Sequence, residues 1–96
     1  MTTFELVSRY NLEDRRVESV AHDAEQKTLE IGVSGPLSLV FEGVSDLAMK
    51  TYVEYSGLII TEVLEDYGRV SFSLYDDISN DYHEISFRAD GVDVTE

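Results

Sequence analysis

The sequence predicts an all-β fold: a single domain, residues 1–96, built as an antiparallel sandwich or partly closed barrel of seven or eight short strands. Three observations predict it. Apolar and polar residues alternate along most of the chain, polar turns separate the alternating stretches, and 96 residues with 43% hydrophobic content are enough for one core only. One short helix is also compatible with the pattern and would make the fold α+β.

The N-terminal half contains four predicted strands. Residues 4–10 carry Phe, Leu, Ser and Tyr on one parity, which predicts a strand at a sheet edge. A weaker strand is expected at 17–22, and clearer ones at 29–33 and 37–41. Ser34-Gly35-Pro36 predicts the turn between the last two.

The middle of the chain is ambiguous. For residues 44–57 we expect a loop or a strand, and Ser45 or Asp46 is placed to cap a single helical turn. Leu58–Leu64 has helical spacing but is rich in β-branched residues, so we expect a strand there. Because both of its faces are apolar, we expect this strand to be central and covered on both sides.

The strongest local prediction is a hairpin after Gly68. Val70–Tyr75 and Tyr82–Arg88 both alternate, and a four-residue loop between them places Tyr75 opposite Tyr82. The same register sets Leu74 opposite His83, Ser73 opposite Glu84 and Phe72 opposite Ile85. It also sets Arg69 opposite Arg88, and Glu65 or Asp90 is expected to offset that repulsion. Residues 91–95 predict a final strand.

The charge excludes several classes of function. Twenty acidic residues against seven Lys and Arg give a net charge of −13, which disfavours nucleic acid and anionic membranes and attracts basic partners. Residues 49–96 hold eleven acidic and three basic residues, so the most negative surface is expected in that half. No cysteine, basic leader or long apolar run is present, so we expect a cytoplasmic protein that binds neither cofactor nor membrane.

No catalytic or metal motif is complete. His22-Asp23 with Glu25 is typical of a strand end, and His83 is expected to face inward beside Leu74. Residues 77–81 resemble the start of a calcium loop, but Tyr82 stands where that loop needs Gly and Arg88 where it needs Glu. A weak surface Ca²⁺ site at Asp76, Asp77 and Asp81 stays open as an alternative. We predict no catalytic residue and no zinc site.

The outer face of the C-terminal hairpin is the predicted binding surface. Its side chains are Ser71, Ser73, Tyr75, Tyr82, Glu84 and Ser86. Tyrosine provides rigid contact area and serine provides adaptable hydrogen bonds, a combination favoured in binding surfaces. The predicted partner-binding residues are Ser73, Tyr75, Asp76, Asp77, Asp81, Tyr82 and Glu84.

Two segments carry a family resemblance. Val17–Ile31, which contains His22-Asp23-Ala24-Glu25, and Leu37–Val44, which reads Leu-Ser-Leu-Val-Phe-Glu-Gly-Val, resemble small β-rich immunity proteins of bacterial polymorphic-toxin systems. The resemblance implies a non-enzymatic cytoplasmic inhibitor that binds a toxin domain, often through an acidic surface. The family has no catalytic residues to transfer.

Charge, hairpin face and resemblance together predict an acidic protein-binding module of the immunity type that occludes a basic partner. Three other classes stay open. The first is a DNA mimic that inhibits a nucleic-acid-binding protein. The second is an enzyme or small-molecule carrier with His22 or His83 at the mouth of a barrel, and the third is a self-associating subunit that pairs through Phe4–Tyr10. Oligomeric state, strand order and partner identity are not predicted.

Overall fold

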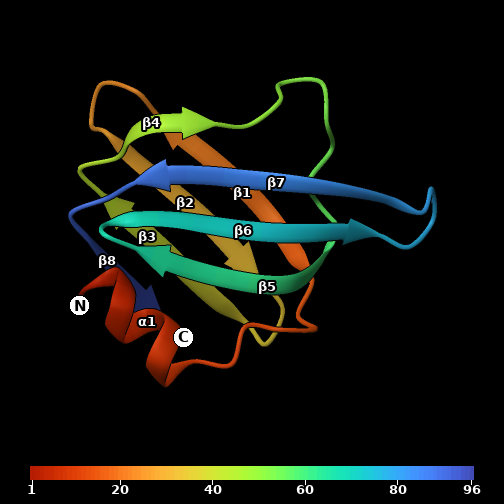
Figure 1. The fold of residues 1–96 in the computed structure, drawn as a ribbon, viewed down its shortest axis with the longest axis horizontal. Helices are drawn as coiled ribbons and strands as arrows, with labels where there is room; N and C mark the ends of the chain where they lie inside the picture. The colour runs from red at the N-terminus through yellow and green to blue at the C-terminus, as the bar shows by residue number, and fades with distance from the viewer.

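Eight antiparallel strands form two four-stranded sheets that face each other, and one short helix lies beside them (Figure 1). The computed structural model describes all residues from 1 to 96. The back sheet has the order β1-β2-β3-β8 and the front sheet the order β4-β7-β6-β5. The elements are α1 (Thr3–Arg9), β1 (Val17–Asp23), β2 (Thr28–Val33), β3 (Leu37–Glu42), β4 (Ser45–Ala48), β5 (Ile59–Asp66), β6 (Arg69–Asp76), β7 (Asp81–Arg88) and β8 (Gly91–Thr95).

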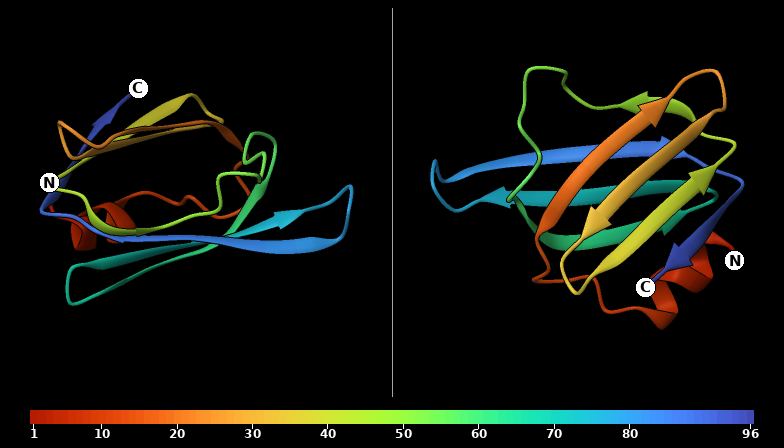
Figure 2. Two further views of the ribbon diagram at one scale, coloured as in Figure 1. Left: turned by 90° about the horizontal axis from the view of Figure 1, so that it is seen from above. Right: turned by 180° about the vertical axis from the view of Figure 1, so that it is seen from behind.

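The chain crosses between the sheets twice. β1, β2 and β3 form a meander in the back sheet, and the chain then passes to β4 at one edge of the front sheet. After a long loop, β5, β6 and β7 form the second meander, and β8 returns to pair with β3. Figure 2 shows the two layers from above and the back sheet from behind. The predicted antiparallel sandwich is therefore confirmed, and the barrel does not close.

The core lies between the sheets and follows the predicted alternation. Leu39 and Phe41 of β3 and Phe72 and Leu74 of β6 are fully buried, and the residues between them face outward. The rings of Phe41 and Phe87 pack edge to face, with centroids 4.8 Å apart and an angle of 71°. Phe72 contacts Phe41 in the same way at 6.0 Å, so one back-sheet ring is wedged against two front-sheet rings.

The strand predicted at residues 4–10 is wrong, because this segment is the helix α1. The Thr2 side chain accepts a hydrogen bond from the Glu5 amide (3.1 Å), and the Glu5 carboxylate accepts one from the Thr2 amide (3.4 Å). This reciprocal capping starts the helix. Helical geometry buries Leu6 completely and leaves Phe4 two-thirds exposed, although a strand would place both on one face. The proposed edge for self-association at Phe4–Tyr10 therefore does not exist.

β5 is a strand, as predicted, but it is not central. It forms one edge of the front sheet, and α1 contacts it. A bulge between Ile60 and Glu62 shifts the register, which leaves Leu64 on the outer face with half of its surface exposed. In the ambiguous segment, β4 is a four-residue strand without a helical turn. No helix in the structure is long and apolar enough to cross a membrane.

Candidate binding surfaces

The β6–β7 hairpin projects past the rest of the front sheet (Figure 1). Its register is the predicted one: Tyr75 lies opposite Tyr82, Ser73 opposite Glu84, and Leu74 opposite His83. The loop has the four predicted residues, 77–80. Because alternation and loop length agree on a single register, a local sequence pattern was sufficient to predict it.

The tip of the hairpin is held by its own hydrogen bonds. The Asp76 carboxylate accepts hydrogen bonds from the amides of Ile78 (2.9 Å) and Ser79 (3.3 Å), and these bonds lower the pKa of Asp76. The Asn80 amide donates to the Asp76 carbonyl at 2.8 Å, and the Tyr75 hydroxyl donates to the Asn80 side chain at 2.6 Å. A loop with this many internal bonds is preorganised, so little conformational entropy is lost when a partner binds it.

Arg16 anchors the hairpin to the start of β1. Its guanidinium donates to both carboxylate oxygens of Asp77, at 2.7 and 3.3 Å, and also to the Gly57 carbonyl at 2.8 Å. The hydrogen bond from Arg16 is the main reason that the pKa of Asp77 is lowered. Asp77 was predicted to contact a partner, but the structure shows its charge already matched by Arg16.

The outer side of the hairpin presents aromatic and apolar surface. The rings of Tyr75 and Tyr82 lie 4.9 Å apart between centroids, and Tyr82 is 74% exposed. Ile78, at the tip, is 95% exposed, although an isoleucine is normally buried. The sequence pattern placed residue 78 in a polar loop, and the predicted partner-binding residues do not include it. Asp81 and Glu84 are exposed nearby, while Ser73 is partly covered.

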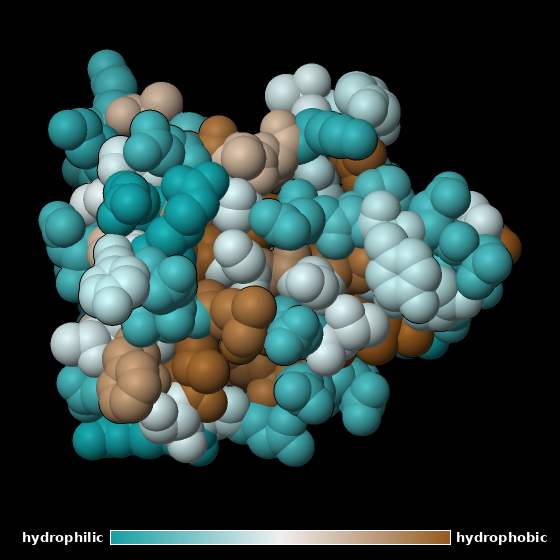
Figure 3. All heavy atoms as spheres, viewed as in Figure 1, coloured by the Kyte–Doolittle hydropathy of each residue, from teal (hydrophilic) through white to brown (hydrophobic).

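The end of the hairpin away from its loop carries two cations, Arg69 and Arg88. The predicted binding surface is therefore smaller than the whole outer face of the hairpin. Arg69 donates to the Ser86 hydroxyl at 2.8 Å, so Ser86 is buried and does not face a partner. Arg88 lies 3.8 Å from Asp46 and donates to the Tyr67 carbonyl at 3.1 Å. The carboxylate that pairs with Arg88 is therefore Asp46, and not Glu65 or Asp90 as expected. Figure 3, which views the front sheet, shows an apolar area over β5, below the hairpin, with hydrophilic side chains around it.

The outer face of the back sheet carries only acidic charges. The pairing register places Asp23, Glu30, Glu42 and Asp93 on this face, between small side chains and with no Lys or Arg. Asp93 raises the pKa of Glu42, through a hydrogen bond between the two side chains and through repulsion of like charges. The sequence predicted the most negative surface in the C-terminal half, yet three of these four residues come from the N-terminal half.

No catalytic or metal-binding cluster is formed. No group of three or more His, Asp or Glu side chains is placed to hold a metal ion, and Asp76, Asp77 and Asp81 do not converge on one. His22 is exposed on β1. A hollow of about 400 Å³ beside His83 contains only one carboxylate, that of Glu84. A histidine beside two carboxylates would support the hypothesis of an enzyme or carrier, and this hollow does not provide that arrangement.

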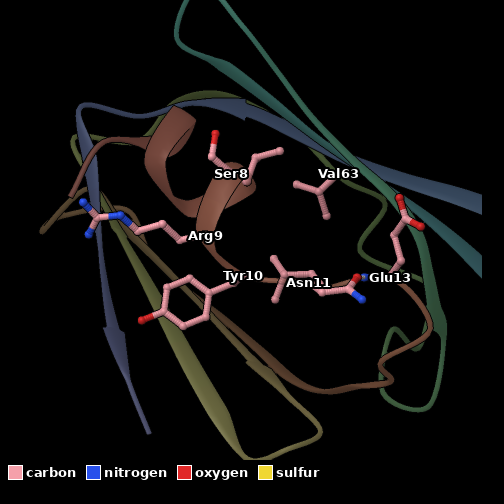
Figure 4. A pocket seen from close by; sticks show the side chains of 8 residues that line it. Ser8, Arg9, Tyr10, Asn11, Glu13 and Val63 are labelled. Carbon is pink, nitrogen blue, oxygen red and sulfur yellow. Dashed lines mark hydrogen bonds between the residues drawn. The ribbon is translucent and has the colours of Figure 1, made fainter.

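A second hollow lies where α1 leads into the following loop, against Val63 (Figure 4). It measures about 310 Å³. The Arg9 and Glu13 side chains lie at opposite ends of it, and Arg9 pairs instead with Glu5 at 3.2 Å. No set of reactive groups converges in this hollow, so it is not a candidate active site.

Fold and surfaces together define the class: a two-sheet antiparallel sandwich with an N-terminal helix, a projecting hairpin and an acidic back face. Comparisons with protein-family models, curated proteins and solved structures found no match for the chain.

Proposed function

We propose that this protein is a non-enzymatic binding module that occludes a basic protein partner, such as a toxin or nuclease domain, with its β6–β7 hairpin. One observation carries the proposal: a preorganised hairpin presents Ile78 and Tyr82 to solvent on a chain whose net charge is −13. The two properties have separate roles. Long-range charge increases the rate of encounter with a cationic partner, and exposed apolar and aromatic groups slow dissociation.

The hairpin has the shape needed for occlusion. It extends beyond the sandwich (Figure 1), and its tip is fixed by Asp76 and by the pair of Arg16 with Asp77. An apolar residue on a rigid projection fits a concave site better than a flat one. This supports a partner with a cleft, and the active sites of enzymes are concave.

The test is affinity capture followed by measured binding. The wild-type chain is immobilised, the protein retained from the source cell is identified and purified, and its Kd is measured for Tyr82→Ala and Ile78→Asp. Tyr52→Ala is the matched control, because Tyr52 is 79% exposed but lies on the loop after β4. We expect at least tenfold weaker binding for both hairpin variants and no change for the control.

Two results would reject the proposal. Equal affinity for all three variants would remove the hairpin from the interface. An association rate that does not fall between 50 mM and 300 mM salt would remove the role of the charge, since screened charges no longer attract a partner over distance.

The back sheet favours a second candidate, a DNA-mimic inhibitor of a nucleic-acid-binding protein. Its support is the outer face that carries Asp23, Glu30, Glu42 and Asp93 and no basic residue. A surface of carboxylates resembles a duplex in charge, because phosphates also present a regular array of anions. In this case Glu30→Gln with Asp93→Asn would weaken capture, Tyr82→Ala would not, and duplex DNA would compete with this protein for the partner.

A further inference from the structure

Five of the eight residues of β7 have no neighbouring strand on one side. β7 runs from Asp81 to Arg88, but β4 pairs only with Arg88 and Ser86. Beyond Ala48 the chain no longer pairs with β7, although Met49 and Lys50 line a hollow beside Glu84 and Ser86. The Lys50 amide donates to the Tyr55 hydroxyl (2.8 Å) rather than to β7. The segment from Asp81 to Ile85 therefore forms an open sheet edge, which is visible to the right of β4 in Figure 1.

The direction of the amides on this edge follows from one hydrogen bond. The Ala89 amide donates to the Gly68 carbonyl at 3.3 Å, so it points toward the β6 side of the hairpin. Because backbone groups of alternate residues point to alternate sides of a strand, the amides of His83 and Ile85 also face β6. The N–H and C=O groups of Tyr82 and Glu84 then face the open edge, where no strand pairs with them.

Open edges of this kind accept added strands, and most proteins cover or charge them. We propose that the open edge of β7 binds an extended segment of a basic protein, which adds to the front sheet antiparallel to β7 and in line with β4. This inference rests on the proposed function for the basic character of the partner. It adds the mode of recognition: backbone pairing to Tyr82 and Glu84.

The surroundings of the edge select the segment. Asp81 and Glu84 are exposed along it, and a hollow of about 400 Å³ continues beside Tyr82 and His83. Lys50 also lines this hollow, so the edge carries one cation beside its two carboxylates. A residue directly opposite Glu84 places its side chain on the same outer face, so Lys or Arg at that position meets a carboxylate. The residues of the bound segment on either side of that position point to the other face, toward His83 and the buried Tyr55. An apolar side chain fits there. The segment therefore alternates basic and apolar residues.

A second copy of the chain is the competing occupant, and charge argues against it. Pairing two β7 edges would bring together two molecules that each carry −13, with Glu84 and Asp81 of one near those of the other. The open stretch also has only five residues, roughly 16 Å of strand, which makes a small interface for two rigid sandwiches.

The test uses an eight-residue peptide that alternates Lys and Val, added to the ¹⁵N-labelled full chain. We expect amide signals of Tyr82 and Glu84 to shift and their hydrogen exchange to slow, with His83 already protected in the free protein. Glu84→Pro removes the open N–H, and proline is tolerated on a strand edge when its missing N–H would face solvent. We expect about tenfold weaker binding by this variant.

Two controls separate backbone pairing from charge. Glu84→Gln removes the carboxylate but keeps the N–H, so it weakens binding less than Glu84→Pro and leaves the pattern of shifts in place. The residue opposite Glu84 directs its own N–H toward β7, so N-methylation of the Lys residues abolishes binding and N-methylation of the Val residues does not.

Shifts spread over the whole acidic surface, or equal affinities for Glu84→Pro and wild type, would overturn the inference, as would a concentration-dependent dimer formed through β7. Its failure differs from failure of the proposed function. A captured partner that loses affinity with Ile78→Asp but not with Glu84→Pro binds the hairpin tip alone. If the peptide binds the β7 edge but the chain captures no basic protein from the source cell, backbone pairing at the edge is supported and the proposed function is rejected.

Discussion

Substitutions at Leu6 and Phe4 test whether the segment Thr3–Arg9 packs against the sandwich as a helix. In the structure Leu6 is completely buried in the core, whereas Phe4 is 66% exposed. A strand over the same residues would place both side chains on one face. Leu6→Ala and Phe4→Ala are therefore expected to differ greatly if the segment is a helix, and to resemble each other if it is a strand.

The magnitude follows from burial. Removing a fully buried leucine side chain to the β-carbon costs about 2–5 kcal/mol, which combines lost transfer free energy with the cavity that remains. Substitution of an exposed residue changes the free energy of unfolding by about 0.5 kcal/mol or less. Domains of this size are stable by about 5–15 kcal/mol, so Leu6→Ala removes a large fraction of the total.

Urea denaturation followed by circular dichroism measures both variants. With a denaturant slope of about 1.5 kcal/mol per molar, a loss of about 3 kcal/mol lowers the urea midpoint by about 2 M. Phe4→Ala is expected to move the midpoint by about 0.3 M or less. Comparable midpoint shifts for the two variants, or a wild-type midpoint for Leu6→Ala, would refute the helical packing described above.

Three further predictions concern charge and hydrogen bonding. The melting temperature should rise between 0.05 and 0.5 M salt, because screening shortens the reach of repulsion from about 10 Å at 0.1 M toward 3 Å at 1 M; an unchanged value in calorimetry would contradict net self-repulsion. Arg16 lowers the folded-state pKa of Asp77, so this pair stabilises the fold fully above the unfolded pKa of about 3.9 and ceases to do so as pH falls through the lower folded value. Asp77→Asn should thus reduce the melting temperature at pH 7 and have little effect near pH 2, and an equal effect at both would exclude the linkage. Tyr55→Phe leaves the Lys50 amide without its partner and should cost about 1–2 kcal/mol in urea titrations, while Tyr52→Phe, at an exposed position, should cost nothing.

The accuracy of the sequence predictions followed the range of the interactions involved. Alternation is a local signal, and it predicted the C-terminal hairpin with its register, because the pattern and the loop length admit one pairing. The N-terminal segment alternates too, but the Thr2-to-Glu5 spacing is the signature of a capping box. Weighing that spacing against the alternation would have identified the helix.

The candidate site was predicted in part. The tyrosine pair, Glu84 and Asp81 lie on the hairpin where the pattern placed them. Ile78 was overlooked, because nothing local distinguishes a loop isoleucine that is buried from one that is exposed. No local pattern indicates that Asp77 is paired, because its partner Arg16 is 61 residues away in sequence.

The sequence by itself determined the antiparallel all-β class, most strand positions and the strongly acidic character, because these depend on periodicity and composition. It left open a sandwich or a partly closed barrel, and the structure shows the sandwich. Only the tertiary structure decided which strands lie at edges, which carboxylates have partners and which sheet face carries acids alone. These features arise from contacts between segments far apart in the chain. Side-chain alternation within a strand does not specify the strand beside it, so the open edge of β7 becomes visible only when β4 is seen to end at Ala48.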